Sequence, residues 1–456
     1  MRPLLALATA LLLAVPAAAA ANVVPATTVA GPSDKLTGTI SFDVAPDGTA
    51  AVGFLLDGHA TVARYANGAW SPAERVDTGL AGASSSVSVT VSPGGRVVAA
   101  FLNGQRALSR VSPASGQPFT AADIQLDPAH NAVEVDAAED GTTYAVTSTT
   151  GGQSDVRAYR LNGTTWQSVG PAFPDPAGAL DADQAKDAGP AGQEGPVLTA
   201  LRGGGAVVAW GEDEGVSAFR MWARRIDGLT AGPARKASPD ALDGAPSAKF
   251  ALLPDLDADA AGRAWLAFRD DFVYGATNRA RILVRSVDPG GLGDPAVVDG
   301  LGASPTEGSE FPRVDVNAKG DGLLATPRQL SNQSWAATLT GGAWSPGFRM
   351  DVTGSDSVTG AWSALGDDGT GAVAWVRDPG GGGARQALAR RRPAGGAFGP
   401  ELPLADTALG SVEGQSVRAG AMTDCSVLVA FTQLAGAERR VAVARLDARR
   451  RRRHDA

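Results

Sequence analysis

The segments ISFDV (residues 40–44), PDG (46–48) and AAVGF (50–54) contain the pattern that decides the fold. In the first segment apolar and polar side chains alternate, which is typical of a β-strand with one buried face. The turn that follows contains a glycine able to adopt a positive φ, and the last segment is a short β-rich run that ends on an aromatic residue. The stretch therefore predicts a β-hairpin.

The same hairpin pattern recurs along the whole chain, and we call each recurrence a unit. Residues 87–101 repeat it closely, and it returns at intervals of 46 to 63 residues near Gly141, Gly204, Gly262, Gly320, Gly369 and Cys425. Each unit continues with a third and, in most cases, a fourth short run. Such periods are typical of solenoids, propellers or strings of modules. Four short antiparallel strands per unit favour a β-propeller, because the rungs of a solenoid are shorter and more regular.

We therefore expect an all-β fold, with one β-propeller over residues 22–447. Its eight units predict eight four-stranded blades, and a seven-bladed ring is the alternative. The eighth unit has only three runs, whereas residues 22–30 look like the fourth run of another unit, such as residues 71–76. This predicts that residues 22–30 complete the last blade and close the ring, which removes exposed strand edges.

On this repeat pattern, nearly all of residues 22–447 resembles the secreted bacterial β-propeller proteins of the sialidase-like and related superfamilies. The resemblance implies a propeller fold. Sialidase-type propellers also imply an Asp-box, S-x-D-x-G-x-x-W, and an arginine triad with a Tyr/Glu nucleophile pair. This sequence contains no Asp-box, and none of its positions matches the triad or the pair. The resemblance therefore bears on the fold and leaves the activity open.

The two ends of the chain differ from the repeated units, and the first of them predicts export. Residues 1–21 have a charged start, an apolar stretch and a run of small residues, which is typical of a signal peptide. The apolar stretch is shorter than the roughly 20 residues of a membrane span, and no later stretch is apolar enough to cross a membrane. Residues 448–456 are expected to form a disordered basic tail. Its five arginines, 449–453, offer contact with an anionic cell-wall polymer as an alternative role.

Composition excludes several classes of protein. The 40 Lys and Arg against 48 Asp and Glu give a net charge of −8, which disfavours nucleic acid as a partner. An apolar content of 44% is sufficient for a large core. Cys425 is the only cysteine, so no intramolecular disulfide can form. With three histidines and no recognisable nucleophile, zinc or phosphate-loop motif, the sequence predicts no catalytic set, metal or cofactor.

Two polar columns repeat from unit to unit. The third run carries an arginine in seven of the eight units, where unit six has Thr338; these are Arg64, Arg110, Arg160, Arg224, Arg285, Arg390 and Arg445. We interpret them as stems packed on a neighbouring blade, and an anionic-polymer surface is the alternative. The first run carries the acidic residues Asp43, Asp136, Asp257 and Asp315. First strands line a propeller's channel, so these carboxylates are expected to face it, as structural groups or around water or a cation.

Aromatic residues close most of the second runs, and repetition in every blade predicts packing between neighbouring sheets rather than ligand contact. These residues are Phe54, Phe101, Trp210, Phe268, Trp375 and Phe431.

The candidate ligand site lies where the units depart most from one another. Loops after the second runs share a face with the loops between blades, and those of units four to seven are polar. They combine both charge signs with an aromatic ring, which suits polyol hydroxyls. The candidate ligand-binding residues are Glu212, Asp213, Arg269, Asp270, Asp271, Tyr274, Arg377 and Asp378.

Three functions fit these observations. The first is a secreted, non-enzymatic propeller that binds an extracellular glycan or protein through its loop face. The second is a glycoside hydrolase or lyase that uses paired carboxylates, and carboxylates from different blades about 5–10 Å apart across one pocket would favour it. The third is a purely structural role.

Overall fold

The structure is a computed structural model that describes residues 22–124, 130–149, 155–171, 195–214, 218–303, 305–351 and 356–447. The expected signal peptide (1–21), the basic tail (448–456) and most of the loop 170–196 lie outside the described residues. Within them the chain is all-β, as the sequence predicts, and its one helical element is the 3-10 turn Thr407–Leu409.

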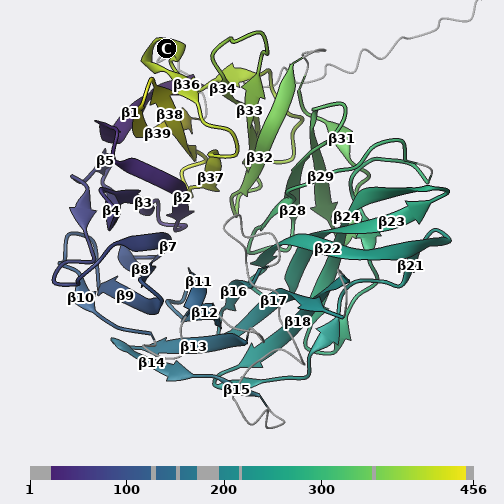
Figure 1. Cartoon of the computed structure of the whole chain (residues 1–456), viewed down its shortest axis with the longest axis horizontal. Coiled ribbons are helices and arrows are strands. Elements are labelled where there is room, and N and C mark those ends of the chain that lie inside the picture. The colour runs from purple at the N-terminus through teal and green to yellow at the C-terminus, as the bar shows by residue number, and fades with distance from the viewer. Residues whose placement is uncertain are drawn as a thin grey trace, which may run out of the picture.

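The strands follow the units of the sequence, and Figure 1 shows them arranged around a centre in a propeller-like way. Unit one contains β2 (Leu36–Val44), β3 (Ala50–Leu56), β4 (His59–Ala66), β5 (Ala69–Trp70) and β6 (Glu74–Arg75). Unit two contains β7 (Ser84–Ser92), β8 (Arg96–Asn103), β9 (Arg106–Ser112) and β10 (Thr120–Ala121). Unit three contains β11 (His130–Ala137), β12 (Thr143–Thr149), β13 (Val156–Asn162) and β14 (Thr165–Ser168).

Units four and five belong to one 12-stranded sheet, which begins at the short strand β15 (Gly170–Pro171). Unit four contains β16 (Val197–Leu201), β17 (Gly205–Asp213), β18 (Phe219–Asp227), β19 (Thr230–Ala231) and β20 (Arg235–Lys236). Unit five contains β21 (Ala241–Leu242), β22 (Ala245–Ala258), β23 (Ala264–Tyr274), β24 (Thr277–Asp288), β25 (Gly291–Leu292) and β26 (Ala296–Val297). A single parallel bridge between Phe219 and Phe250 links β18 to β22 and so joins the two units.

The last three units form one sheet each. Unit six contains β27 (Arg313–Val316), β28 (Gly322–Pro327), β29 (Ser334–Thr340), β30 (Ala343–Trp344) and β31 (Phe348–Arg349). Unit seven contains β32 (Ser357–Leu365), β33 (Gly371–Asp378), β34 (Gln386–Arg392) and β35 (Leu402–Pro403). Unit eight contains β36 (Ser411–Val412), β37 (Arg418–Ala421), β38 (Val427–Ala435) and β39 (Glu438–Asp447).

Strand β1 (Asn22–Ser33) comes from the other end of the chain and pairs antiparallel with β39. The register runs from Asn22 opposite Asp447 to Ser33 opposite Arg439. Residues 22–30 therefore occupy the position next to β39, and the first and last described strands lie side by side (Figure 1).

The core lies between neighbouring sheets. The six aromatic residues that close the second strands are all fully buried, which confirms the prediction that they pack inside the fold; they are Phe54, Phe101, Trp210, Phe268, Trp375 and Phe431. Gly53 shows how closely units one and two approach, because a Cβ atom there would lie 2.7 Å from side-chain carbons of both Val87 and Val89.

The arginine column links neighbouring units at several places. Arg64 donates to the Ser112 hydroxyl and the Gln117 carbonyl of unit two. Arg285 donates to the Ala237 carbonyl of unit four, and Arg445 donates to the Tyr65 hydroxyl of unit one. For these three arginines the expected packing on a neighbouring blade is confirmed.

Candidate functional site

A cavity of about 1200 Å³ lies at the centre of the molecule. Its walls contain residues of the strands that open the hairpins of the eight units, the first runs of the sequence; these strands are β2, β7, β11, β16, β22, β27, β32 and β37. The prediction that first strands line a central channel is therefore confirmed, and Figure 1 shows these strands around the centre. Because side chains two positions apart on a strand share a face, each strand presents successive layers of residues to the channel.

One layer contains the acidic column, and its carboxylates connect adjacent units. Asp43 accepts hydrogen bonds from the Val91 N–H at 2.7 Å and from the Thr90 hydroxyl at 2.9 Å. In the same way Asp136 accepts from the Ala200 N–H, Asp257 from the Val316 N–H and Asp315 from the Leu365 N–H. Each carboxylate thus binds the backbone of the following unit. The contacts confirm that the column faces the channel and give it a structural role.

Burial raises the pKa values of the carboxyl groups in this layer. Desolvation, with a contribution from Asp43, raises the pKa of Asp136 to about 6. Desolvation also raises the pKa of Asp315 to about 7. Burial and the adjacent Asp315 raise the pKa of Asp257 well above its ordinary value. Two negative charges close together in one low-dielectric site are unfavourable, so one of the carboxyls tends to stay protonated.

A second layer lies two residues earlier on the same strands and contains Glu134, Asp255, Arg313, Trp362 and Arg418. Burial, together with the negative charges of Asp255 and Asp136, raises the pKa of Glu134 to about 8. Within the described chain, no hydrogen bond reaches the Glu134 carboxyl. Asp255 differs, because it accepts from the Val314 N–H at 2.7 Å and from Arg313 at 3.3 Å.

The opposite part of this layer is cationic. The guanidinium carbons of Arg313 and Arg418 lie 4.6 and 4.3 Å from the ring centre of Trp362. Burial, with a smaller contribution from the charge of Arg313, lowers the pKa of Arg418 to about 9. Burial also raises the pKa of Asp255, although Arg313 and the Val314 N–H oppose that rise. The layer therefore places two carboxyl groups with raised pKa values and different hydrogen-bond partners beside a cationic wall.

Sequence analysis missed this second layer. Its signal was available, because Glu134, Asp255 and Arg313 each stand two residues before a member of the acidic column and so lie on the same strand face. Trp362 and Arg418 occupy the same position in units seven and eight, where the column itself is absent.

The residues expected to bind a ligand on the loop face form local contacts. Arg269 makes ion pairs with Asp271 at 2.8 Å and with Glu310 at 2.7 Å, and all three side chains are less than a third exposed. Gln329 also donates to Glu310. Together they form a polar group that crosses from unit five to unit six.

The other predicted residues are divided among three strands. On β17, Glu212 is buried and accepts from the indole N–H of Trp210 at 2.6 Å, and Asp213 follows it. On β23, the Tyr274 hydroxyl accepts from Arg281, and Asp270 is fully buried near Arg220 and Ser238, where desolvation raises its pKa to about 7. On β33, Arg377 donates to Gln386, and Asp378 accepts from Arg385.

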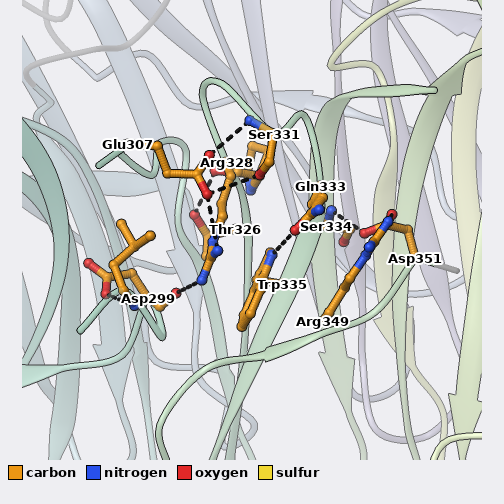
Figure 2. Close-up of polar contacts among 12 residues, drawn as sticks. Asp299, Glu307, Thr326, Arg328, Ser331, Gln333, Ser334, Trp335, Arg349 and Asp351 are labelled. Carbon is orange, nitrogen blue, oxygen red and sulfur yellow. Dashed lines mark hydrogen bonds and ion pairs between the residues drawn. The ribbon is translucent and has the colours of Figure 1, made fainter. Parts of the chain in front are cut away.

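A further polar network holds the outer strands together. Figure 2 shows Asp351 accepting from the Ser334 N–H and from Arg349, and Arg328 donating to Glu307 and to the Asp299 carbonyl. Asp77 in unit one and Asp299 in unit five likewise accept backbone N–H groups of the third run, from Ala60 on β4 and from Ile282 on β24. These aspartates repeat at the end of the fourth runs, and their contacts indicate a structural role.

No metal cluster or membrane helix is found in the described parts of the chain. They contain no group of three or more His, Cys, Asp or Glu side chains placed to hold a metal ion. They also contain no helix that is long and apolar enough to cross a membrane.

No family model and no curated protein matches this sequence. Among solved structures it is similar to an ulvan lyase of a polysaccharide lyase family, with 10% identity, a TM-score of 0.48 and coverage of 92% of this chain and 95% of that chain. It is also similar to an α-L-arabinanase from Penicillium chrysogenum, with 13% identity, a TM-score of 0.44 and coverage of 94% and 99%.

The β-propeller domain of the Trilobed protease from Pyrococcus furiosus is another similar structure, with 11% identity, a TM-score of 0.43 and coverage of 81% and 97%. At these identities and TM-scores the similarities do not bear on what this chain binds or cleaves. The functional argument therefore depends on the channel itself.

Proposed function

We propose that the chain is a carbohydrate-cleaving enzyme of the glycoside hydrolase type, with its active site in the central channel. One observation carries the proposal: Glu134 of unit three and Asp255 of unit five, from different sheets, line one cavity, and the charge of Asp255 helps to raise the pKa of Glu134. Sequence analysis takes carboxylates from different units, about 5–10 Å apart across one pocket, as the feature that favours an enzyme; the shared cavity and the electrostatic interaction of these two residues support it.

The two carboxyls suit complementary roles. With a pKa of about 8, Glu134 is protonated at neutral pH and can donate a proton to the departing glycosidic oxygen. Arg313 and the Val314 N–H stabilise the ionised form of Asp255, which can act as base or nucleophile at the anomeric carbon. Glycoside hydrolysis requires one carboxyl that donates a proton and a second that acts as an anion, and the hydrogen bonds to Asp255 favour the second role for it.

The proposal includes the architecture around the channel. Residues 1–21 act as a signal peptide, residues 22–447 form one eight-bladed propeller, and residues 448–456 form a basic tail. The pairing of β1 with β39 supports closure by residues 22–30, and the eight units support the blade number. On this view the protein is secreted, and its tail contacts anionic cell-wall polymer.

The second candidate function is glycan or protein binding without catalysis. The polar group of Arg269, Asp271, Glu310 and Gln329 favours it, because it combines both charge signs with amide donors near the loop face. This candidate needs no reaction in the channel. Activity and binding must therefore be measured on the same preparation.

The experiment is a panel of chromogenic glycosides offered to the wild type and to the variants Glu134→Gln and Asp255→Asn. Loss of turnover in both variants, with unchanged melting temperatures, supports the enzyme. Asp43→Asn is the matched control, since Asp43 faces the channel but binds the backbone of unit two. Equal turnover by all the proteins would place the active site elsewhere. Absence of turnover by the wild type, with saturable binding on a glycan array, would favour the binding module.

A further inference from the structure

The arginine column is interrupted once, at Thr338 of unit six. In unit seven the equivalent residue is Arg390, which lies across the boundary between these two units. A residue that repeats in most units has a structural role. Its replacement in one unit indicates that this role is absent there. Threonine is also much shorter than arginine, and its side chain leaves space that an arginine stem would fill.

A cavity of about 390 Å³ lies at this interruption. Thr338, Phe348 and Met350 line it from unit six, and Arg390, Arg392 and Phe398 line it from unit seven. The cavity is thus a groove between the outer strands of adjacent units, separate from the central channel. The Thr338 hydroxyl is occupied by a hydrogen bond with the Ser345 hydroxyl, so it closes one end of the groove without offering a charge.

The groove combines an apolar wall with positive charge. The rings of Phe348 and Phe398 meet across the unit boundary with their centres 6.0 Å apart and their planes tilted by 49°. Arg390 contributes a buried Nε atom that has no hydrogen-bond partner among the described residues. Figure 2 shows that the third arginine, Arg349, is bonded to Asp351, which leaves Arg390 and Arg392 as the groove's available cations.

We propose that this groove binds a single sugar residue that carries a carboxylate, such as a hexuronate unit of an acidic glycan. The C–H face of a pyranose ring packs on aromatic rings, and a guanidinium binds a carboxylate through paired charge-assisted hydrogen bonds. A neutral sugar lacks the negative charge that pairs with the guanidinium, so it should bind more weakly than the carboxylated sugar. The volume is in the lower part of the range of small-molecule sites, which suits one ring.

The groove site is independent of the proposed catalysis in the channel. It shares no lining residue with the channel cavity, so either site can fail without the other.

The test is isothermal titration calorimetry of the full mature chain with methyl glucuronide and with methyl glucoside. Saturable binding of the glucuronide, at least about tenfold tighter than that of the glucoside, is expected from one charge-assisted contact. Thr338→Arg restores the residue found in the other seven units and should fill the groove and abolish binding without lowering the melting temperature. Arg390→Gln removes the positive charge but keeps a polar, unbranched stem, and it should weaken binding about tenfold, which keeps the proposal testable if the Thr338 variant does not fold.

Arg418→Gln is the matched control, because Arg418 offers a guanidinium in the channel instead. Binding that survives in this variant and is lost in Thr338→Arg supports the groove. Binding lost in Arg418→Gln but retained in Thr338→Arg would transfer the acidic sugar to the channel and overturn the proposal. Equal affinity for the two glycosides, or no binding of either, would overturn it as well.

Discussion

Arg313 lies over the ring of Trp362, with 4.6 Å between the guanidinium carbon and the ring centre. Arg418 lies over the same ring at 4.3 Å, so Trp362 contacts cations contributed by units six and eight. Each contact gains from the negative face of the indole ring, which offsets part of the repulsion between the two like charges. Trp362 therefore helps to stabilise two arginines in one layer.

Replacing Trp362 with Leu should lower the free energy of unfolding by roughly 1–3 kcal/mol. Two cation–π contacts of about 0.5–2 kcal/mol each are lost, while most of the apolar volume is retained. Urea denaturation followed by far-ultraviolet circular dichroism measures the change. Trp362→Phe is the control, since it keeps an aromatic face and should fall between the wild type and the Leu variant. Equal stability of the Leu and Phe variants would show that the cation–π contacts contribute nothing.

The strands and the core could be predicted from the sequence because they depend on local, repeated information. Alternation, turn glycines and terminal aromatics recur in each unit, so the burial of Phe54 and Trp375 follows from the pattern alone. The contact between Asp43 and the Val91 N–H also depends on a repeated position. Residues that repeat in every unit have structural roles, and a search for repeats detects such residues.

The search for repeats missed the channel's second layer because its residue types differ from unit to unit, although three of its members stand two residues before the acidic column. Glu134, Asp255 and Arg418 come from units three, five and eight, and only closure of the strands around a centre brings them into one cavity. The loop-face residues are the converse case. Asymmetry selected Arg269 and Asp271, but the ion pair that joins Arg269 to Glu310 depends on the position of unit six.

The stability of the protein should fall as the pH rises from about 5 to 8. Glu134, Asp136, Asp270 and Asp315 have pKa values raised to between about 6 and 8 in the folded state, whereas the unfolded chain titrates near 4. Between those values the folded state binds more protons than the unfolded state, so the free energy of unfolding decreases with pH. Each group contributes on the order of 1 kcal/mol or more.

Guanidinium chloride denaturation at pH 5 and pH 8 measures this decrease. In Glu134→Gln the decrease should be smaller, because glutamine does not titrate and its uncharged amide avoids the cost of ionisation. A pH-independent free energy of unfolding in the wild type would contradict the raised pKa values. The same result for the wild type and the Gln variant would remove Glu134 from the explanation.

Replacing Arg269 with Ala should destabilise the fold by about 2 kcal/mol. Sequence analysis treated Arg269 and Asp271 as ligand-binding residues of the loop face. Their side chains are 14% and 12% exposed, and the substitution leaves Asp271 and Glu310 without their cation. Thermal unfolding measures the effect, and Arg269→Lys, which keeps the charge, is the control. A melting temperature equal to that of the wild type would show that these residues do not stabilise the fold, as expected of ligand-binding residues.

Truncating Trp375 to Ala should cost roughly 3–5 kcal/mol. Its side chain is fully buried within a cluster that includes Leu323 of unit six and Leu388 of unit seven, so the change leaves a cavity that neighbours fill only in part. Denaturant titration gives the difference directly. Phe398, at the half-buried edge of the same cluster, provides the comparison, and Phe398→Ala should cost clearly less.

Deleting residues 22–30 from a chain that begins at Asn22 should lower the melting temperature and promote aggregation. Val23 and Ala26 pack against the core shared by units seven and eight, and Val29 and Ala30 pack against the core of units eight and one. The deletion therefore exposes apolar surface of both cores and leaves most of the outer edge of β39 without its partner strand. Differential scanning calorimetry and light scattering measure the two effects. The matched control removes an equal number of residues from the other end, 448–456, and should melt like the full mature chain. Equal melting temperatures of the two truncated proteins would show that β1 does not stabilise the fold. Early melting and light scattering of the first protein alone would support the role of the pairing between β1 and β39.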